Sequence, residues 1–177
     1  MKGLKIRVLA SKTESAFVAE FGGTGVPMPF SEVLPGLQRG VIDGVRSGII
    51  VMGPMKFYTV AKHIYNEAMG YIPSGMWLSK HFLNKLPANY RAAIFESGDA
   101  VSVRTGKVAL EITAKWEKLW IKNGGTFTEP TAADRAMMFR RAGPIGDRLL
   151  GSNPKIKPMY ELIKAAAQKH RGAKPPM

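Results

Sequence analysis

Cysteine is absent from the 177 residues, so disulfides, thiol catalysis and cysteine-ligated zinc are excluded. Long apolar runs are absent as well. The most apolar patch, SGIIVMGPM at residues 47–55, is interrupted by glycines and a proline and is too short to cross a bilayer. With 45% hydrophobic residues and a mean hydropathy of −0.08, the composition is typical of one globular domain with its own core.

Catalytic and nucleotide-binding motifs are also missing. There is no P-loop, no G-x-S-x-G and no H-E-x-x-H, and GGTGVP at residues 22–27 lacks the third glycine of a dinucleotide fingerprint. The three histidines have no paired ligand spacing. Of the few carboxylates, Glu32 and Asp43 are placed for capping or turns rather than acid–base work. We therefore expect a protein that is not an enzyme, with no metal and no cofactor.

Acidic residues are scarce, with 13 Asp and Glu against 26 Lys and Arg, for a formal charge of +13. Such a charge favours anionic partners, which include nucleic acid, acidic lipid and small anions. A basic, well-solvated surface is the plainer alternative, since the positive residues are spread along the chain. A basic, non-enzymatic module that binds nucleic acid or anionic surfaces is the alternative function. Against nucleic acid, the aromatic residues occupy core-like positions: Phe30, Phe57, Tyr58, Trp77, Trp116 and Trp120.

Residues 1 to about 80 contain short strands and turns. LKIRVLA at residues 4–10 alternates like a strand, with Ile6 and Val8 on one face and Lys5 and Arg7 on the other. GVPMPF at residues 25–30 predicts a strand entering a turn, and residues 32–44 predict a short helix, a glycine break and an extended piece. Residues 70–79 read as a strand kinked at Pro73.

The second half is mostly helical. A three-to-four apolar spacing predicts a long helix from Ala88 to about Asn123, bounded by Pro87 and a Gly-Gly stop, with one apolar face packed along more than one unit. A short strand at residues 126–130 follows, then a helix capped by Thr131 and kinked or ended by Pro144, and a final helix over residues 153–171. Strands alternating with helices indicate an α/β fold with a small, largely parallel sheet flanked by helices.

The order of these elements resembles a known family. MKGLKIRV, then GVPMPFSEVLPGLQRGVIDG, then KFYTVAKH, LNKLPANYRAAI and NGGTFTEP are similar to the solute-binding proteins of tripartite ATP-independent periplasmic (TRAP) transporters, of the DctP type. The resemblance covers nearly the whole chain. It implies the second lobe of a type II periplasmic-binding-protein-like fold plus a long bridging helix. The implied parts are residues 1–72 with the ligand motif, 73–125 with the bridging helix, and 126–177 with the C-terminal helices.

The resemblance also implies ligand-binding residues. From the strand pattern alone, Arg7 would be a solvated charge, but it matches the family's cleft arginine, whose planar fork of donors pairs with a carboxylate as a lysine cannot. Phe30 matches the cleft phenylalanine, framed by Pro27 and Pro29, with Ser31 left to cap the short helix; a core phenylalanine is the alternative. Met28, in the same run, is included in the predicted site.

The chain departs from the family where DGQENP reads DGVRSG at residues 43–48. Ser47 replaces the asparagine that reaches the ligand, and Arg46 replaces the neighbouring acid. Arg46 either adds a second positive group for a dianionic ligand or faces solvent. The ligand preference of the family therefore does not carry over.

Family members are longer, with a signal peptide and an N-terminal lobe before the first strand seen here. Lys5 and Arg7 exclude a signal peptide at residues 1–15, so we expect a truncated form. The implied function is capture of a small organic anion in the periplasm and its delivery to a TRAP membrane permease, with weak binding by this chain alone. Uncovered strand edges and apolar faces would favour a homo-oligomer, a swapped dimer or poor solubility.

Overall fold

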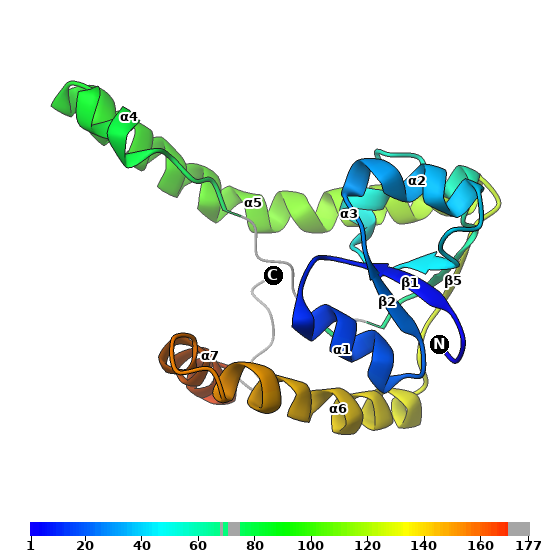
Figure 1. Ribbon diagram of the computed structural model, residues 1–177. Coiled ribbons are helices and arrows are strands. Elements are labelled where there is room, and N and C mark those ends of the chain that lie inside the picture. The colour runs from blue at the N-terminus through cyan, green and yellow to red at the C-terminus, as the bar shows by residue number, and fades with distance from the viewer. Residues whose placement is uncertain (68, 71–74, 170–177) are drawn as a thin grey trace.

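The computed structural model describes residues 1–67, 69–70 and 75–169. Its first unit is a parallel three-stranded sheet in the order β2-β1-β3, from β1 (Lys5–Val8), β2 (Thr24–Pro27) and β3 (Gly44–Val45). Parallel neighbours need crossover connections, and α1 (Lys12–Glu20) and α2 (Phe30–Gln38) supply them. The two helices cover opposite faces of the sheet (Figure 1), which confirms the predicted α/β class and parallel sheet.

Each face of this sheet has its own core. Ile6 and Val8 of β1 pack with Phe17 and Val18 of α1 and with Ile145 on one face. The other face is covered by residues from α2, the following loops and the long helix, with Val33, Ile42, Met52, Phe57 and Trp120 fully packed. Because both faces of β1 are covered, a side chain within this strand, such as that of Arg7, cannot be surrounded by solvent.

A second, two-stranded parallel sheet joins β4 (His63–Tyr65) to β5 (Thr126–Thr128). Between β3 and β4 lie the one-turn helix α3 (Ile49–Met52) and the 3-10 helix η1 (Phe57–Thr59). Trp120 of the long helix is anchored to this region by burial and by a hydrogen bond. It is 1% exposed, and its indole Nε1 donates to the Lys62 carbonyl at 3.0 Å. The predicted buried role of Trp120 is confirmed.

The longest element is α5 (Ala88–Lys122), preceded by α4 (Lys80–Lys85). Pro87 precedes its first turn, and Gly124, with a φ of +77°, follows Asn123 at its end, as the sequence predicts. Only its C-terminal end packs on α3, however, and the rest projects from the body beside α4 (Figure 1). The predicted apolar face is mostly exposed within the described residues, because no element there covers it.

The C-terminal helices first cover α1 and then extend beyond it. α6 (Ala132–Gly146) begins with a capping box between Thr131 and Asp134, confirming the predicted cap, and packs along α1. Pro144 does not end α6 at once; the helix continues to Gly146 and then into the π-helical segment η2 (Asp147–Gly151). α7 (Lys157–Lys169) completes the chain's described part and confirms the predicted final helix.

Several predictions of local structure are wrong. Neither α1 nor α4 was expected, because each is short and polar and carries little apolar periodicity. Of the predicted kinked strand, residues 71–74 lie outside the described residues, while Gly75–Ser79 form no strand and Trp77 is 93% exposed rather than core. Ser31 is not a cap: α2 begins at Phe30, two residues earlier than a Ser31 cap would place it, with Pro29 at its N-cap and no side-chain cap bond.

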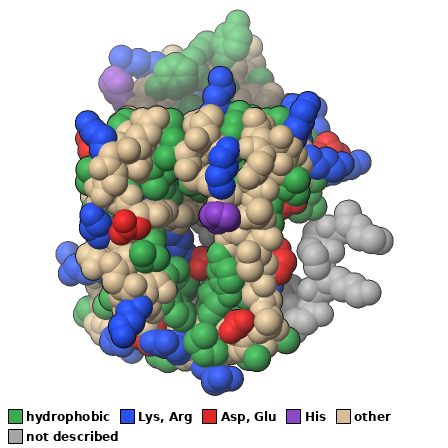
Figure 2. Space-filling model, turned by 90° about the vertical axis from the view of Figure 1, so that its right-hand side faces the viewer, with side chains coloured by type: hydrophobic (Ala, Val, Ile, Leu, Met, Phe, Trp, Pro, Cys, Tyr) green, Lys and Arg blue, Asp and Glu red, His purple; other side chains and the backbone are tan. Residues whose placement is uncertain are grey.

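On the face shown in Figure 2, basic side chains are scattered rather than gathered in one patch. Within the described residues, no helix combines the length and apolarity needed to cross a membrane.

Candidate functional site

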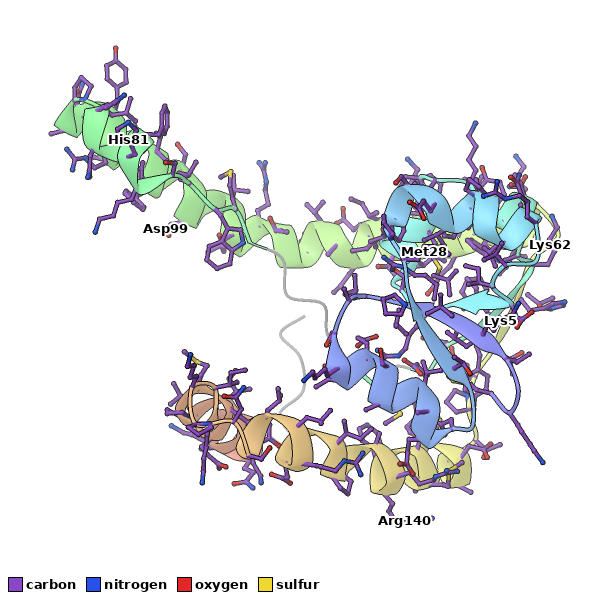
Figure 3. All side chains as sticks on the ribbon, viewed as in Figure 1. Lys5, Met28, Lys62, His81, Asp99 and Arg140 are labelled. Atoms are coloured by element: carbon purple, nitrogen blue, oxygen red, sulfur yellow. The ribbon has the colours of Figure 1, made fainter. Side chains whose placement is uncertain are left out.

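All five residues of the predicted site lie at one edge of the three-stranded sheet. β1, β2 and β3 end at Val8, Pro27 and Val45, so their carboxyl ends meet there. The chain passes from β1 to β2 on one side and returns to β3 on the other, which is the reversal of strand order where open α/β sheets bind ligands. The edge carries Arg7, Met28, Phe30, Arg46 and Ser47. Figure 3 places Met28 where β2 meets α2, away from His81 and Asp99 on the projecting helices.

Arg7 is buried on the α2 face, with only 3% of the residue exposed. Its Nε and Nη2 both donate to the Met28 carbonyl, at 3.1 and 3.0 Å, and its guanidinium carbon lies 5.0 Å from the centre of the Phe30 ring. The solvated-charge alternative is therefore wrong. Burial lowers the pKa of Arg7, with the negative charge of Glu14 acting in the opposite direction, and an arginine remains cationic under such a shift.

One nitrogen of the Arg7 guanidinium has no partner in the part of the chain described. Nη1 has no hydrogen-bond partner among the described residues, and no fully buried side-chain nitrogen or oxygen there lacks a partner. Nη1 therefore keeps contact with solvent although the rest of the side chain is covered. The guanidinium is thus held in one orientation with a single open N–H side.

Phe30 and Met28 build the wall around Arg7. Phe30, the first residue of α2, is half-buried and stacks on Phe57, with ring centres 5.6 Å apart and planes 12° from parallel. It therefore belongs to the core and to the edge at once. Met28 contacts Arg7 through its carbonyl, while its sulfur packs near Gly36 of α2. Ser47 is half-buried, and its hydroxyl has no hydrogen-bond partner in the part of the chain described.

Arg46 lies on the opposite, α1 face of the sheet, and two carboxylates hold it. Its Nη1 donates to both oxygens of Glu14 at 2.6 Å, and its Nε donates to Glu67 Oε1 at 2.6 Å. The guanidinium also lies 4.2 Å from the centre of the Phe17 ring. We call Glu14, Arg46 and Glu67 the charge triad; sequence reasoning found only Arg46 of the three, since the acids lie 32 and 21 residues away from it.

Burial and charge act differently within the charge triad. Burial alone would lower the pKa of Arg46, but its two ion pairs outweigh burial and the pKa is raised. Burial raises the pKa of Glu67 and outweighs the attraction and hydrogen bond of Arg46, and the nearby negative charge of Glu14 raises this pKa further. One arginine thus pairs with two carboxylates, so the triad carries a net negative charge.

A cavity of about 390 Å³ lies beside the charge triad, between α1, α6 and η2. Glu14 and Arg46 form its polar wall, and mostly apolar side chains, among them Phe17, Met69 and Phe139, form the rest. Arg7 and Phe30 do not line it, and they contact each other directly rather than across a hollow. In the described residues, no group of three or more His, Asp or Glu is arranged to hold a metal ion.

Three known proteins show what this architecture is similar to. The chain is 31% identical over 149 residues to the C4-dicarboxylate-binding periplasmic protein DctP of Rhodobacter capsulatus, covering 83% of this chain and 44% of that protein. Its fold matches a TRAP periplasmic solute-binding protein of Shewanella oneidensis with bound succinate (TM-score 0.80, 27% identity, 96% of this chain and 54% of that one). It also matches the periplasmic ectoine-binding protein of Halomonas elongata (TM-score 0.85, 20% identity, 95% and 56%).

The chain spans about half the length of these relatives. The family model for bacterial extracellular solute-binding proteins, family 7 (DctP), matches residues 1–152. This confirms the resemblance drawn from the sequence motifs, and the chain belongs to that family.

Proposed function

We propose that this chain contributes the arginine-bearing wall of an extracytoplasmic solute-binding protein, which captures a small organic anion for a TRAP transporter and delivers it to a membrane permease. The proposal rests on the fixed orientation of the Arg7 side chain. Its guanidinium is fixed at the carboxyl edge of a parallel sheet by the Met28 carbonyl and the Phe30 ring, with Nη1 left open.

A carboxylate would bind to the open side of this guanidinium. Hydrogen bonds between ionised groups are shorter and stronger than neutral ones, and burial strengthens them further. Because Met28 already holds two of the arginine's nitrogens, little side-chain entropy remains to be lost on binding. At 3% exposure of Arg7, the anion has a narrow approach, so the Phe30 ring has to shift as the ligand arrives.

The other predicted residues take lesser roles. Met28 orients Arg7 through its carbonyl, Phe30 flanks the ligand, and the free hydroxyl of Ser47 offers one hydrogen bond. Arg46 contributes to anion binding mainly through its electrostatic field, since Glu14 and Glu67 already pair with its Nη1 and Nε. Relatives named as periplasmic support an extracytoplasmic location for the protein.

The proposal is tested by ligand binding to the full 177-residue chain. Succinate, acetate and a uronate are titrated and followed by ligand-observed NMR, which detects weak complexes, and by calorimetry. We expect carboxylate binding that Arg7→Lys weakens at least tenfold, because an ammonium cannot keep two bonds to Met28 and also present a donor to the ligand. Arg140→Lys, on the exposed surface of α6, is the matched control and should bind as the wild type does.

Two outcomes would contradict the proposal. If Arg7→Lys bound carboxylates as the wild type does, Arg7 would not be the anion site. If the chain bound only polyanions such as nucleic acid, with an affinity that falls steeply with salt, the basic-module alternative would explain the charge of +13 instead.

A further inference from the structure

The two arginines at the carboxyl edge differ in the charge that surrounds them. Among the described residues Arg7 has no acidic hydrogen-bond partner, since it donates both of its bonds to a neutral carbonyl, whereas Arg46 is shared by two carboxylates. They are neighbours in the sheet: the backbone N–H of Arg46 donates to the carbonyl of Arg7 at 3.0 Å. Counting one positive charge for Arg7 and one net negative charge for the charge triad, the edge is close to neutral.

We propose that the charge triad restricts the ligand to one with a single carboxylate, and that Glu14 and Glu67 favour a cationic or neutral group at the ligand's other end over a second carboxylate. This inference rests on the proposed function, since it assumes that a ligand carboxylate binds Arg7. It concerns which small organic anion fits.

Position supports this selectivity. Arg7 lies on the α2 face and the triad on the α1 face, so a ligand lying across the edge with its carboxylate on Arg7 has its far end near the triad. The backbone N–H of Arg46, whose side chain pairs with Glu14, donates to the Arg7 carbonyl at 3.0 Å, so Arg7 and the triad are adjacent along the edge. Burial lowers the pKa of Arg7, and the charge of Glu14 acts to raise it. Glu14 and Glu67 keep 25% and 18% of their side-chain surfaces exposed, and Glu14 also lines the cavity. The far end of the ligand can therefore reach an acid.

The contacts of Arg46 explain why it does not stabilise a second ligand carboxylate. Both Glu14 oxygens bond its Nη1, Glu67 bonds its Nε, and Phe17 covers one face of its guanidinium plane. Nη2 of Arg46 has no hydrogen-bond partner among the described residues, but a second ligand carboxylate that reached it would come close to both Glu14 and Glu67, which pair with the same guanidinium. Like charges in a partly buried site repel far more strongly than in water, so a dianion is disfavoured.

The test compares three ligands of one length on the full chain: succinate, 4-hydroxybutyrate and 4-aminobutyrate, which carry two, one and zero net negative charges at pH 7. We expect succinate to bind about tenfold more weakly than 4-aminobutyrate, a difference worth about 1.4 kcal/mol, with 4-hydroxybutyrate between them. In the double variant Glu14→Gln, Glu67→Gln, the difference in affinity between succinate and 4-aminobutyrate should decrease or reverse. The reason is that Arg46 is then free to act as a second anion site.

Glu20→Gln is the matched control, because Glu20 lies on the same helix as Glu14 and is paired with Arg141 instead. It should leave the order of the three ligands unchanged. Arg46→Gln tests the opposite direction and does not depend on the double variant folding: with both acids unpaired, the preference against succinate should grow.

The possible outcomes distinguish a failure of the ligand selectivity from a failure of the proposed function. Wild-type protein that binds succinate as tightly as the two other ligands, or a double variant with an unchanged order, overturns the selectivity while leaving the anion site standing. Failure of all three ligands to bind contradicts the carboxylate site on Arg7, and the inference falls with it.

Discussion

At the scale of residues, partners decide what each arginine does. Arg7 and Arg46 are one hydrogen bond apart in neighbouring strands, yet one side chain meets a carbonyl and an aromatic ring while the other meets two carboxylates. A buried charge is tolerated only with such partners, because its desolvation is costly. The arrangement leaves Nη1 of Arg7 without a hydrogen-bond partner among the described residues and makes Arg46 part of the protein's own ion network.

The raised pKa of Glu67 predicts a pH dependence of stability. Because burial raises this pKa, the folded protein binds the proton more readily than the unfolded chain at pH values from about 4.3 upward to the raised pKa. The unfolding free energy therefore falls as the pH rises through that interval. In Glu67→Gln the group cannot titrate, so urea unfolding across a pH series should show a less negative slope there than the wild type shows.

Asp147 provides the contrast for this measurement. Hydrogen bonds from Lys164 and Tyr160 lower its pKa, so its contribution to stability is present above the ordinary aspartate pKa of about 3.9 and is lost as the pH falls through the lowered value. Asp147→Asn should therefore remove a slope of the opposite sign at lower pH. Equal pH profiles for the wild type and Glu67→Gln would show that Glu67 has its ordinary pKa.

At the scale of elements, α5 plays two different parts along its length. Near its C-terminal end, Trp116 lies against Gly53 at the end of α3, and Trp120 lies against Gly125. An added Cβ at Gly53 would come within 2.4 Å of the Trp116 ring, whereas one at Gly98 would meet nothing within 4 Å. The same helix is thus closely packed at one end and uncovered at the other.

A pair of identical substitutions measures this difference. Gly98→Ala should raise the unfolding free energy by about 0.5–1 kcal/mol, because alanine is the better helix former and has free space there. Gly53→Ala should lower it by about 1–3 kcal/mol, because the methyl group overpacks the contact with Trp116. Urea denaturation at one temperature compares the two variants, and a neutral Gly53→Ala would mean that α5 does not pack on α3 as described.

At the scale of the whole molecule, a small two-faced core carries two helical projections, α4 with most of α5, and α7 beyond the end of α6 (Figure 1). Large apolar side chains are exposed along both, including Val103 at 86% and Leu110 at 66% on α5, and Leu162 at 65% on α7. Extended apolar surface on a protein marks a site of association. The net charge of +13 opposes association between copies through mutual repulsion.

These two effects predict self-association that increases with salt. Screening shortens the range of the repulsion between copies and leaves the apolar attraction intact, so light scattering should report a larger mass in 0.5 M salt, with a Debye length of roughly 4 Å, than at low ionic strength. Val103→Lys should reduce the association. Ala100→Lys adds the same charge to exposed α5 without removing a large apolar group and should have the smaller effect. A monomer under all conditions would contradict the prediction.

Local signals in the sequence predicted several elements because each depends on neighbouring residues alone. Apolar spacing with Pro87 and Gly124 predicted α5, the Thr131 cap predicted α6, and alternation predicted β1. The helix α1 was missed because only Phe17 and Val18 of its nine residues are buried, so it has little periodicity to detect. Packing against β1 and α6 stabilises it instead.

The sequence by itself determined the family and the α/β class, since these follow from residue order and short-range pattern, and the family resemblance predicted the five candidate site residues. Only the tertiary structure decided that Arg46 is held by Glu14 and Glu67, that Met28 acts through its carbonyl, and that the apolar face of α5 lies largely uncovered. The physical reason is distance along the chain: ion pairs and burial depend on which segments fold against one another, and no local pattern records that.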